Sequence, residues 1–163
     1  PIAPEDYEGY KELKNKLKIN IAGGEGEFTK WGWRHLIQNR CIDIAQPEVC
    51  GLGGITEYLK VAALAQANFI PVVNHVWGSA LSIAVNLHLL TAMPDMPGGL
   101  FPAKPMLEFD TTDNNIFISD LTEEKFDIFN QVKNNNGFVK ALEGHGIGLN
   151  PRKDFIKKYE ITK

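Results

Sequence analysis

The alternation of short apolar runs with helical patterns is the feature that most constrains how this chain can fold. Apolar runs typical of strands lie at residues 18–22, 42–45, 70–74 and 105–109. The spacing of apolar residues predicts helices over residues 6–17, 30–40, 55–68 and 80–92. Short apolar strands that alternate with helices of about a dozen residues indicate parallel strands joined by crossover helices. Because the strands are apolar throughout, we expect both faces of the sheet to be covered.

Two architectures satisfy this α/β pattern, an open doubly wound sheet and a (β/α)-barrel. The alternation stops after Asp110, and residues 111–163 are richer in Asn and Lys. One or two short helices are predicted there, with the last one over residues 151–159. We therefore predict two parts, an α/β part over residues 1–110 and an irregular extension over residues 111–163.

Composition and charge exclude several classes of protein. The 163 residues carry 17 Lys and Arg against 20 Asp and Glu, which gives a formal net charge of −3, and 44% of them are hydrophobic. This balance excludes a disordered tail, a collagen-like chain and a disulfide-dense small protein. A slightly acidic chain without a basic run argues against a nucleic-acid partner. No apolar stretch reaches the length of a membrane span and the start lacks a signal-peptide pattern, so we expect no membrane partner.

The two cysteines, Cys41 and Cys50, are too few to staple a chain of this size and lack the spacing of a metal site. Both flank apolar residues at the edges of a predicted strand, so we expect two buried thiols. Buried thiols outside disulfides are typical of a reducing compartment, and the predicted location is therefore the cytoplasm.

One acidic or basic residue stands at the carboxyl end of each predicted strand. These residues are Glu25, Glu48, His75 and Glu108. In parallel α/β folds the loops at these ends converge, and catalytic groups collect there. A histidine beside a carboxylate is a general base, because the carboxylate fixes the tautomer and stabilises the imidazolium. A further carboxylate can hold Mg²⁺, and a base with a cation is suited to removing a proton next to a carboxylate.

Five short motifs give the chain a resemblance to a known family. They are Ala22-Gly23-Gly24-Glu25, Gln46-Pro47-Glu48, Gly53-Gly54-Ile55-Thr56-Glu57, Asn74-His75 and Met106-Leu107-Glu108-Phe109-Asp110. In this order they resemble the enolase superfamily, in the branch of mandelate racemase, muconate lactonizing enzyme and the acid-sugar dehydratases. Residues 1–10 and 146–149 also fit, so the resemblance covers nearly the whole chain.

The resemblance implies a role for each of the four residues. Glu25 matches the metal-binding glutamate after the fifth barrel strand, and the implied cofactor is Mg²⁺. Glu48 stands where the family usually has the Asp of a His–Asp dyad, and His75 matches the base of that dyad. Glu108 matches the acid of the eighth strand, which hydrogen-bonds the substrate carboxylate or enediolate. Glu27 is a rival for Glu25, but the Gly-Glu context and the spacing to Glu48 favour Glu25.

The resemblance also implies that part of the enzyme lies outside this sequence. A (β/α)8 barrel takes about 250 residues, so we expect residues 1–110 to be its carboxy-terminal half, strands five to eight. Residues 111–163 would form a tail that returns toward a capping domain. The family's first two metal-binding acids and its Lys pair would precede Pro1. Lys16-Leu17-Lys18 imitates that pair, but it precedes its strand and so belongs to the end opposite the catalytic one.

We therefore expect an Mg²⁺-dependent enzyme that abstracts the proton α to a carboxylate, most simply for the dehydration of an acid sugar. His75 would be the base, or the acid that assists departure of the hydroxyl group. A racemase or epimerase of the same superfamily is the alternative. Hypotheses of another class are a catalytically incompetent fragment, an assembly module, or a small-molecule-binding domain of the doubly wound type. The expected partners are a small acid-sugar or 2-hydroxy acid substrate and further copies of the chain in a homo-oligomer.

Overall fold

The computed structural model describes residues 2–93, 106–111 and 115–161. The chain forms two compact units, of which the first comprises Pro1–His75 and Met93–Glu108 and the second comprises Val76–Ala92 and Phe109–Lys163. Pro105, the first residue of a predicted strand, lies outside the described residues, and so does the loop before it. The division of the chain at residue 110 stays a prediction.

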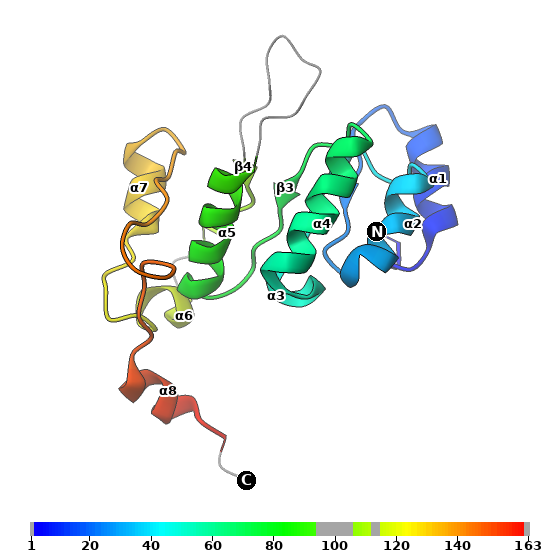
Figure 1. Ribbon diagram of the computed structural model, residues 1–163. Helices are drawn as coiled ribbons and strands as arrows, with labels where there is room; N and C mark the ends of the chain where they lie inside the picture. Colours follow the sequence, from blue (N-terminus) through cyan, green and yellow to red (C-terminus); the bar gives the residue numbers. More distant parts are fainter. Residues whose placement is uncertain (1, 94–105, 112–114, 162–163) are drawn as a thin grey trace. The chain divides into compact units, whose positions relative to one another are not determined.

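Four two-residue strands pair in parallel within the first unit (Figure 1). They are β1 (Ala22–Gly23), β2 (Ile44–Ala45), β3 (Val73–Asn74) and β4 (Met106–Leu107). β1 pairs with β2, β3 pairs with β4, and an isolated parallel bridge between Ala45 and Val72 links the two sheets. The strands thus neighbour one another in chain order, as crossover helices require. The α/β class is confirmed, and over the described residues these sheets remain open.

The strands are shorter than the sequence predicts. At the start of β1 the carbonyl oxygen of Ile21 still accepts hydrogen bonds from the N–H groups of Asp43 and Ile44, but the N–H of Ile21 binds a side chain. The N–H of Ile21 donates to Oδ2 of Asp43 at 2.9 Å, and Lys14 Nζ lies 2.8 Å from Oδ1 of the same carboxylate. The hydrogen bond from Ile21 and the ion pair with Lys14 lower the pKa of Asp43. The predicted strand over residues 18–22 is therefore confirmed only at Ala22.

Three predicted helices of the first unit are confirmed, with ends shifted by one or two residues. They are α1 (Tyr7–Lys16), α2 (Thr29–Gln38) and α4 (Gly54–Ala67). Asp6 caps α1, because its Oδ1 accepts a hydrogen bond of 2.9 Å from the N–H of Gly9. A further helix, α3 (Val49–Leu52), has only four residues, which is too short for a periodic pattern to predict it.

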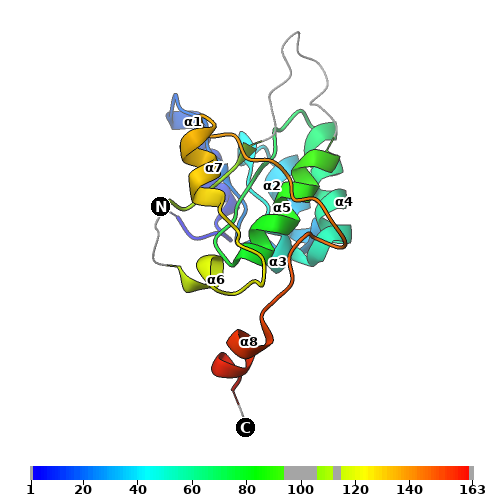
Figure 2. The same cartoon turned by 90° about the vertical axis from the view of Figure 1, so that its left-hand side faces the viewer.

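Helices α2 and α4 pack side by side and supply core residues of the first unit (Figures 1 and 2). Their buried apolar residues are Trp33, Leu36 and Ile37 of α2 and Tyr58, Val61, Ala62 and Ala65 of α4. Trp33 also closes on Gly24, where a Cβ would lie 2.3 Å from the indole and where φ is +111°. Any larger residue at this position would displace Trp33, so the path from β1 to Glu25 depends on this glycine.

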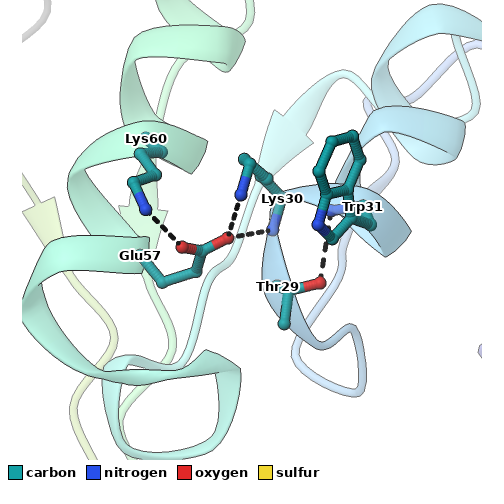
Figure 3. Close-up of polar contacts among 5 residues, drawn as sticks. All are labelled: Thr29, Lys30, Trp31, Glu57 and Lys60. Atoms are coloured by element: carbon teal, nitrogen blue, oxygen red, sulfur yellow. Dashed lines mark hydrogen bonds and ion pairs between the residues drawn. The ribbon is translucent and has the colours of Figure 1, made fainter.

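Glu57 joins the first turn of α4 to the first turn of α2 (Figure 3). Its Oε1 accepts a hydrogen bond of 2.9 Å from the backbone N–H of Lys30, and its Oε2 accepts one of 2.9 Å from Lys60 Nζ. The hydrogen bond from the Lys30 N–H, with a contribution from Lys60, lowers the pKa of Glu57 to about 2. The side chain of Thr29 also binds the backbone of this turn, because its hydroxyl oxygen accepts a hydrogen bond of 3.2 Å from the N–H of Trp31. The start of α2 is thus capped by a residue 27 positions along the chain.

The second unit contains α5 (Ala80–Ala92) and three shorter helices. These are α6 (Ile116–Ser119), α7 (Ile128–Asn134) and α8 (Lys153–Tyr159). α5 confirms the predicted apolar helix, and α8 confirms the predicted last helix. An antiparallel bridge joins Thr122 to Pro151, and His88 on α5 lies 3.1 Å from the carbonyl oxygen of Ile147 through its Nε2.

Two expectations drawn from composition can be compared with the structure. Cys41 is buried but Cys50, the second residue of α3, is exposed, so the prediction of two buried thiols is wrong for Cys50. In the described part of the chain, every helix is too short or too polar to cross a membrane.

We predict that Glu57→Gln weakens the first unit in a pH-dependent manner. The carboxylate keeps its charge in the folded state down to about pH 2, whereas in the unfolded chain its pKa is near the ordinary value of 4.5. Its stabilising effect is therefore complete above about pH 4.5 and is lost as the pH falls through about 2. In urea titrations the difference between wild type and variant should be largest at pH 7 and shrink toward zero at pH 2.

Glu123→Gln is the matched control, since Glu123 is exposed and lies in the second unit. An equal loss for Glu57→Gln at pH 7 and pH 2 would contradict a stabilising role for the ionised carboxylate.

Candidate active site

The four candidate residues lie directly after the four strands, as the sequence predicts. Glu25 follows β1 by two residues, Glu48 follows β2 by three, and His75 and Glu108 each follow their strand by one. All four belong to the first unit. Because the strands are parallel neighbours, their carboxyl ends share one edge, and this edge carries the candidate site.

Backbone hydrogen bonds hold this edge together. The N–H of Gln46 donates to the carbonyl oxygen of Gly23 at 2.9 Å, and the N–H of Glu108 donates to that of Asn74 at 3.0 Å. Between these pairs, the N–H of Ala45 donates to the carbonyl oxygen of Pro71 at 2.9 Å. The backbone next to each candidate side chain is therefore fixed by its neighbouring strand.

The imidazole of His75 lies between two carboxylates. Its Nε2 is 3.1 Å from Oε2 of Glu25, and its Nδ1 is 3.4 Å from Oε2 of Glu48. The Nδ1 atom is buried and its geometry toward Glu48 falls short of a hydrogen bond. The Glu25 side chain is 62% exposed, whereas those of Glu48 and His75 are 14% and 17% exposed. Nε2 is consequently the ring nitrogen on the side of the exposed carboxylate, and Nδ1 is the buried one that faces Glu48.

Glu48 has a second structural task at the start of α3. It is the N-cap residue, and its Oε1 accepts a hydrogen bond of 3.0 Å from the N–H of Cys50. One carboxylate oxygen thus caps a helix while the other faces His75. The backbone contact restricts the side chain of Glu48 and so holds its charge beside the imidazole.

Asn74 anchors the strand end that carries His75. It is fully buried, and its Oδ1 accepts a hydrogen bond of 2.5 Å from the hydroxyl group of Tyr58 on α4. Burial raises the pKa of Tyr58 to about 12, so this hydroxyl keeps its proton over the physiological range. Because successive side chains of a strand point to opposite faces, the anchoring of Asn74 toward α4 directs His75 to the other face.

Glu27, the alternative to Glu25 as the metal-binding glutamate, makes its contacts with other residues. It is buried, and its Oε1 accepts a hydrogen bond of 2.7 Å from the hydroxyl group of Tyr7 on α1. Burial and this bond to Glu27 raise the pKa of Tyr7 to about 12. Its other oxygen fills the space beside Gly32, where a Cβ would lie only 2.2 Å away. Of the two glutamates, Glu25 is the one that contacts His75.

Glu108 meets a residue that sequence reasoning did not select. Its Oε2 accepts a hydrogen bond of 3.2 Å from Nε2 of Gln46. Over the described residues its side chain makes no ion pair with His75, so the structure brings together Glu25, Glu48 and His75 but places Glu108 beside Gln46. The sequence does contain one indication of Gln46. This residue precedes Glu48 by two positions and therefore faces the same side of an extended segment.

Tyr10 on α1 is a further neighbour that the sequence did not identify. A Cβ at Gly23 would lie 3.5 Å from its hydroxyl oxygen, which places that hydroxyl next to the end of β1. Burial, with smaller effects from the charges of Glu25 and Glu27, raises the pKa of Tyr10.

The chemistry of the donor set decides whether these residues can hold a divalent cation. Glu25 fits the role of one ligand, because its carboxylate is exposed and lies beside the imidazole. Among the described residues there is no group of three or more histidines, cysteines and carboxylates arranged to hold a metal ion. Mg²⁺ needs six oxygen ligands and is commonly bound through one or two carboxylates with waters and substrate groups. The described residues therefore fit part of a magnesium site.

Comparison with known protein families identifies the class of protein to which these parallel strands and the acidic cluster at their carboxyl ends belong. The family model described as "Enolase C-terminal domain-like" matches residues 1–155. The chain therefore belongs to the enolase superfamily, with the carboxy-terminal domain of the mandelate racemase and muconate lactonizing enzyme branch. This confirms the family that the sequence motifs suggest.

Individual relatives agree with this assignment. D-galactarolactone cycloisomerase of Agrobacterium fabrum is 31% identical over 161 residues, which are 99% of this chain and 41% of the relative. The crystal structure of 3,6-anhydro-D-galactonate cycloisomerase from Zobellia galactanivorans matches with a TM-score of 0.77 and 31% identity, over 98% of this chain and 41% of that one. A provisionally named dehydratase from Salmonella enterica matches with a TM-score of 0.81 and 29% identity, over 98% and 36%.

The chain spans about two fifths of the length of these relatives. The matched part is the carboxy-terminal barrel region of enolase-superfamily enzymes.

The double task of Glu48 leads to a prediction for two variants. Glu48→Ala removes the acceptor for the Cys50 N–H and should lower the free energy of unfolding by about 1 kcal/mol, as loss of a helix cap does. Glu48→Gln keeps an acceptor oxygen and should stay within about 0.5 kcal/mol of wild type. Urea unfolding followed by circular dichroism measures both. An equal loss in the two variants would show that the charge and not the cap stabilises this segment.

The partial donor set leads to a second prediction, for the 163-residue chain on its own. Titration calorimetry with MgCl₂ should give no binding heat up to about millimolar concentration, because one exposed carboxylate does not displace the tightly held waters of Mg²⁺. Tight binding that disappears in Glu25→Gln would contradict this and would mean that the chain carries a complete site.

Proposed function

We propose that this chain is the carboxy-terminal part of an enzyme that abstracts the proton α to a carboxylate, and that the reaction is dehydration of an acid sugar. The observation that carries the proposal is the position of His75 between Glu25 and Glu48 at the carboxyl ends of parallel strands. Residues 1–110 would supply strands five to eight of a (β/α)8 barrel, and residues 111–163 the tail that returns toward a capping domain.

His75 performs the proton transfer in this proposal. Nδ1 is buried against Glu48, so Nε2 is the atom available to a substrate. Nε2 takes the α-proton, and the electron pair of the broken C–H bond moves into the carboxylate group to give an enediolate. The nearby charges of Glu25 and Glu48 stabilise the imidazolium that forms. General base catalysis of this kind typically contributes about 10²–10⁴-fold to the rate.

The departure of the hydroxyl group completes the dehydration. The enediolate expels the β-hydroxyl group, whose C–O bond breaks with its electron pair on oxygen, and the His75 imidazolium returns the proton so that water leaves. The remaining enol then becomes a 2-keto acid. If His75 serves only as this acid, a residue other than His75 has to be the base.

Glu25 and Glu108 would act on the substrate carboxylate. Glu25, which is exposed, would contribute one ligand to a divalent cation, with Mg²⁺ as the proposed ion and the remaining ligands from outside this chain. When bound, such a cation neutralises the charge that develops on the enediolate oxygens. Glu108 would hydrogen-bond the same carboxylate from the end of β4.

Cycloisomerisation is the second candidate. Two relatives at 31% identity carry this name, and their names refer to a galactarolactone and an anhydrogalactonate. The same enediolate would then expel a ring oxygen in place of a free hydroxyl group. A racemase or epimerase, also represented among the relatives, would return the proton to the opposite face.

Mass and configuration of the product separate these three reactions. Dehydration lowers the product mass by one water, whereas cycloisomerisation and racemisation leave the mass unchanged, and only racemisation inverts the α-carbon. The enzyme to be assayed is the longest natural polypeptide that contains this chain, with MgCl₂ and a panel of acid sugars and their lactones.

We predict that His75→Asn lowers kcat by at least about 10²-fold on the best substrate of this panel, because the proton acceptor is lost. His145→Asn is the matched control, since His145 is exposed and lies in the second unit. It should leave kcat within about twofold of wild type. Equal activities for the two histidine variants would refute the assignment of His75.

A further inference from the structure

Gln46 links the ends of β2 and β4 across the strand that carries His75. Its backbone N–H is held by Gly23 of β1 at 2.9 Å, and its side-chain Nε2 donates to Oε2 of Glu108 at 3.2 Å. β2 contacts the start of the β3 segment through the bridge from Ala45 to Val72, and β4 pairs with β3. The amide of Gln46 therefore reaches over one intervening strand.

Glu108 needs such a partner to adopt one orientation. Its backbone is fixed by the hydrogen bond from its N–H to Asn74, but the residue is exposed, and an exposed carboxylate on a long side chain samples several rotamers. A hydrogen bond from a half-buried amide favours one of these rotamers. It also occupies Oε2 and leaves Oε1 for a substrate.

The amide supplies a donor without a charge. A Lys at position 46 would place a cation next to Glu108 and would pair with its carboxylate. The amide of Gln46 donates to Oε2 whether Glu108 is ionised or protonated. In the protonated form, donation to Oε2 makes it the carbonyl oxygen and places the O–H on Oε1, where it can donate to an enediolate.

We propose that Gln46 is a positioning residue for Glu108, which it holds with Oε1 directed at the substrate carboxylate. The proposal rests on the proposed function, because Glu108 acts on a substrate only if the enzyme forms an enediolate. Neither the sequence motifs nor the names of the relatives give Gln46 this role.

The contact itself can be tested without any assay of activity. The side-chain NH₂ signals of Gln46 in a ¹H–¹⁵N spectrum should shift in Glu108→Ala, because the hydrogen bond is lost. The signals of Gln38, an exposed residue in the last turn of α2, should stay unchanged. Unchanged Gln46 signals would overturn the proposal.

The positioning role is tested by kinetics on the longest natural polypeptide that contains this chain. Gln46→Leu and Gln46→Glu should each lower kcat about tenfold with KM within about twofold, the loss expected for one hydrogen bond to a charged group that acts in the transition state. Gln46→Glu keeps the size and shape of the side chain, so a purely structural role predicts that it retains wild-type kcat. Gln38→Leu is the control and should match wild type.

A double-mutant cycle shows whether Gln46 acts through Glu108. In the Glu108→Ala background, replacing Gln46 by Leu should change kcat less than about twofold. Full additivity of the two effects would overturn the proposal, and so would a wild-type kcat in Gln46→Glu. An enzyme that acts on no acid sugar or lactone overturns the proposed function and this role together. The NMR contact would then persist, which distinguishes that result from a failure of the hydrogen bond.

Discussion

The parallel pairing of four short strands is the constraint on which the candidate site depends. In this register Gly23 lies opposite Ala45 and Asn74 lies opposite Leu107. Each of these residues is followed within three positions by Glu25, Glu48, His75 or Glu108. A slip of one residue would turn every side chain of a strand to the opposite face and would separate His75 from both carboxylates. The buried hydrogen bond between Tyr58 and Asn74 opposes such a slip in β3.

Glu48 stands where the resemblance to the enolase superfamily implies an aspartate. One of its carboxylate oxygens accepts a hydrogen bond from the Cys50 N–H while the other lies 3.4 Å from Nδ1 of His75. The helix cap restricts this side chain and so keeps its charge beside the imidazole. The buried Nδ1 of His75 faces this charge without a hydrogen bond, and its Nε2 lies on the side of Glu25.

Much of the fold and of the candidate site follows from the sequence, and the exceptions have physical causes. Helical periodicity predicts α1, α2, α4 and α5, but it cannot predict α3, whose four residues depend on a cap from Glu48. Apolar runs locate the strands but overestimate their length, since hydropathy does not register that the N–H of Ile21 donates to the side chain of Asp43. Position after a strand selects Glu25, Glu48 and His75. Spacing places Gln46 on the same side as Glu48, but its contact with Glu108 joins residues 62 positions apart, which no local pattern encodes.

The central claim is that His75 moves a proton at the carbon next to a carboxylate. The most direct measurement is NMR of the α-proton of acid sugars and their lactones in D₂O with MgCl₂ and the longest natural polypeptide that contains this chain. The account predicts that at least one of these compounds loses its α-proton signal, or is converted with solvent deuterium incorporated, and that His75→Asn abolishes this. Absence of exchange and conversion across the panel, or exchange that persists unchanged in His75→Asn, would contradict it.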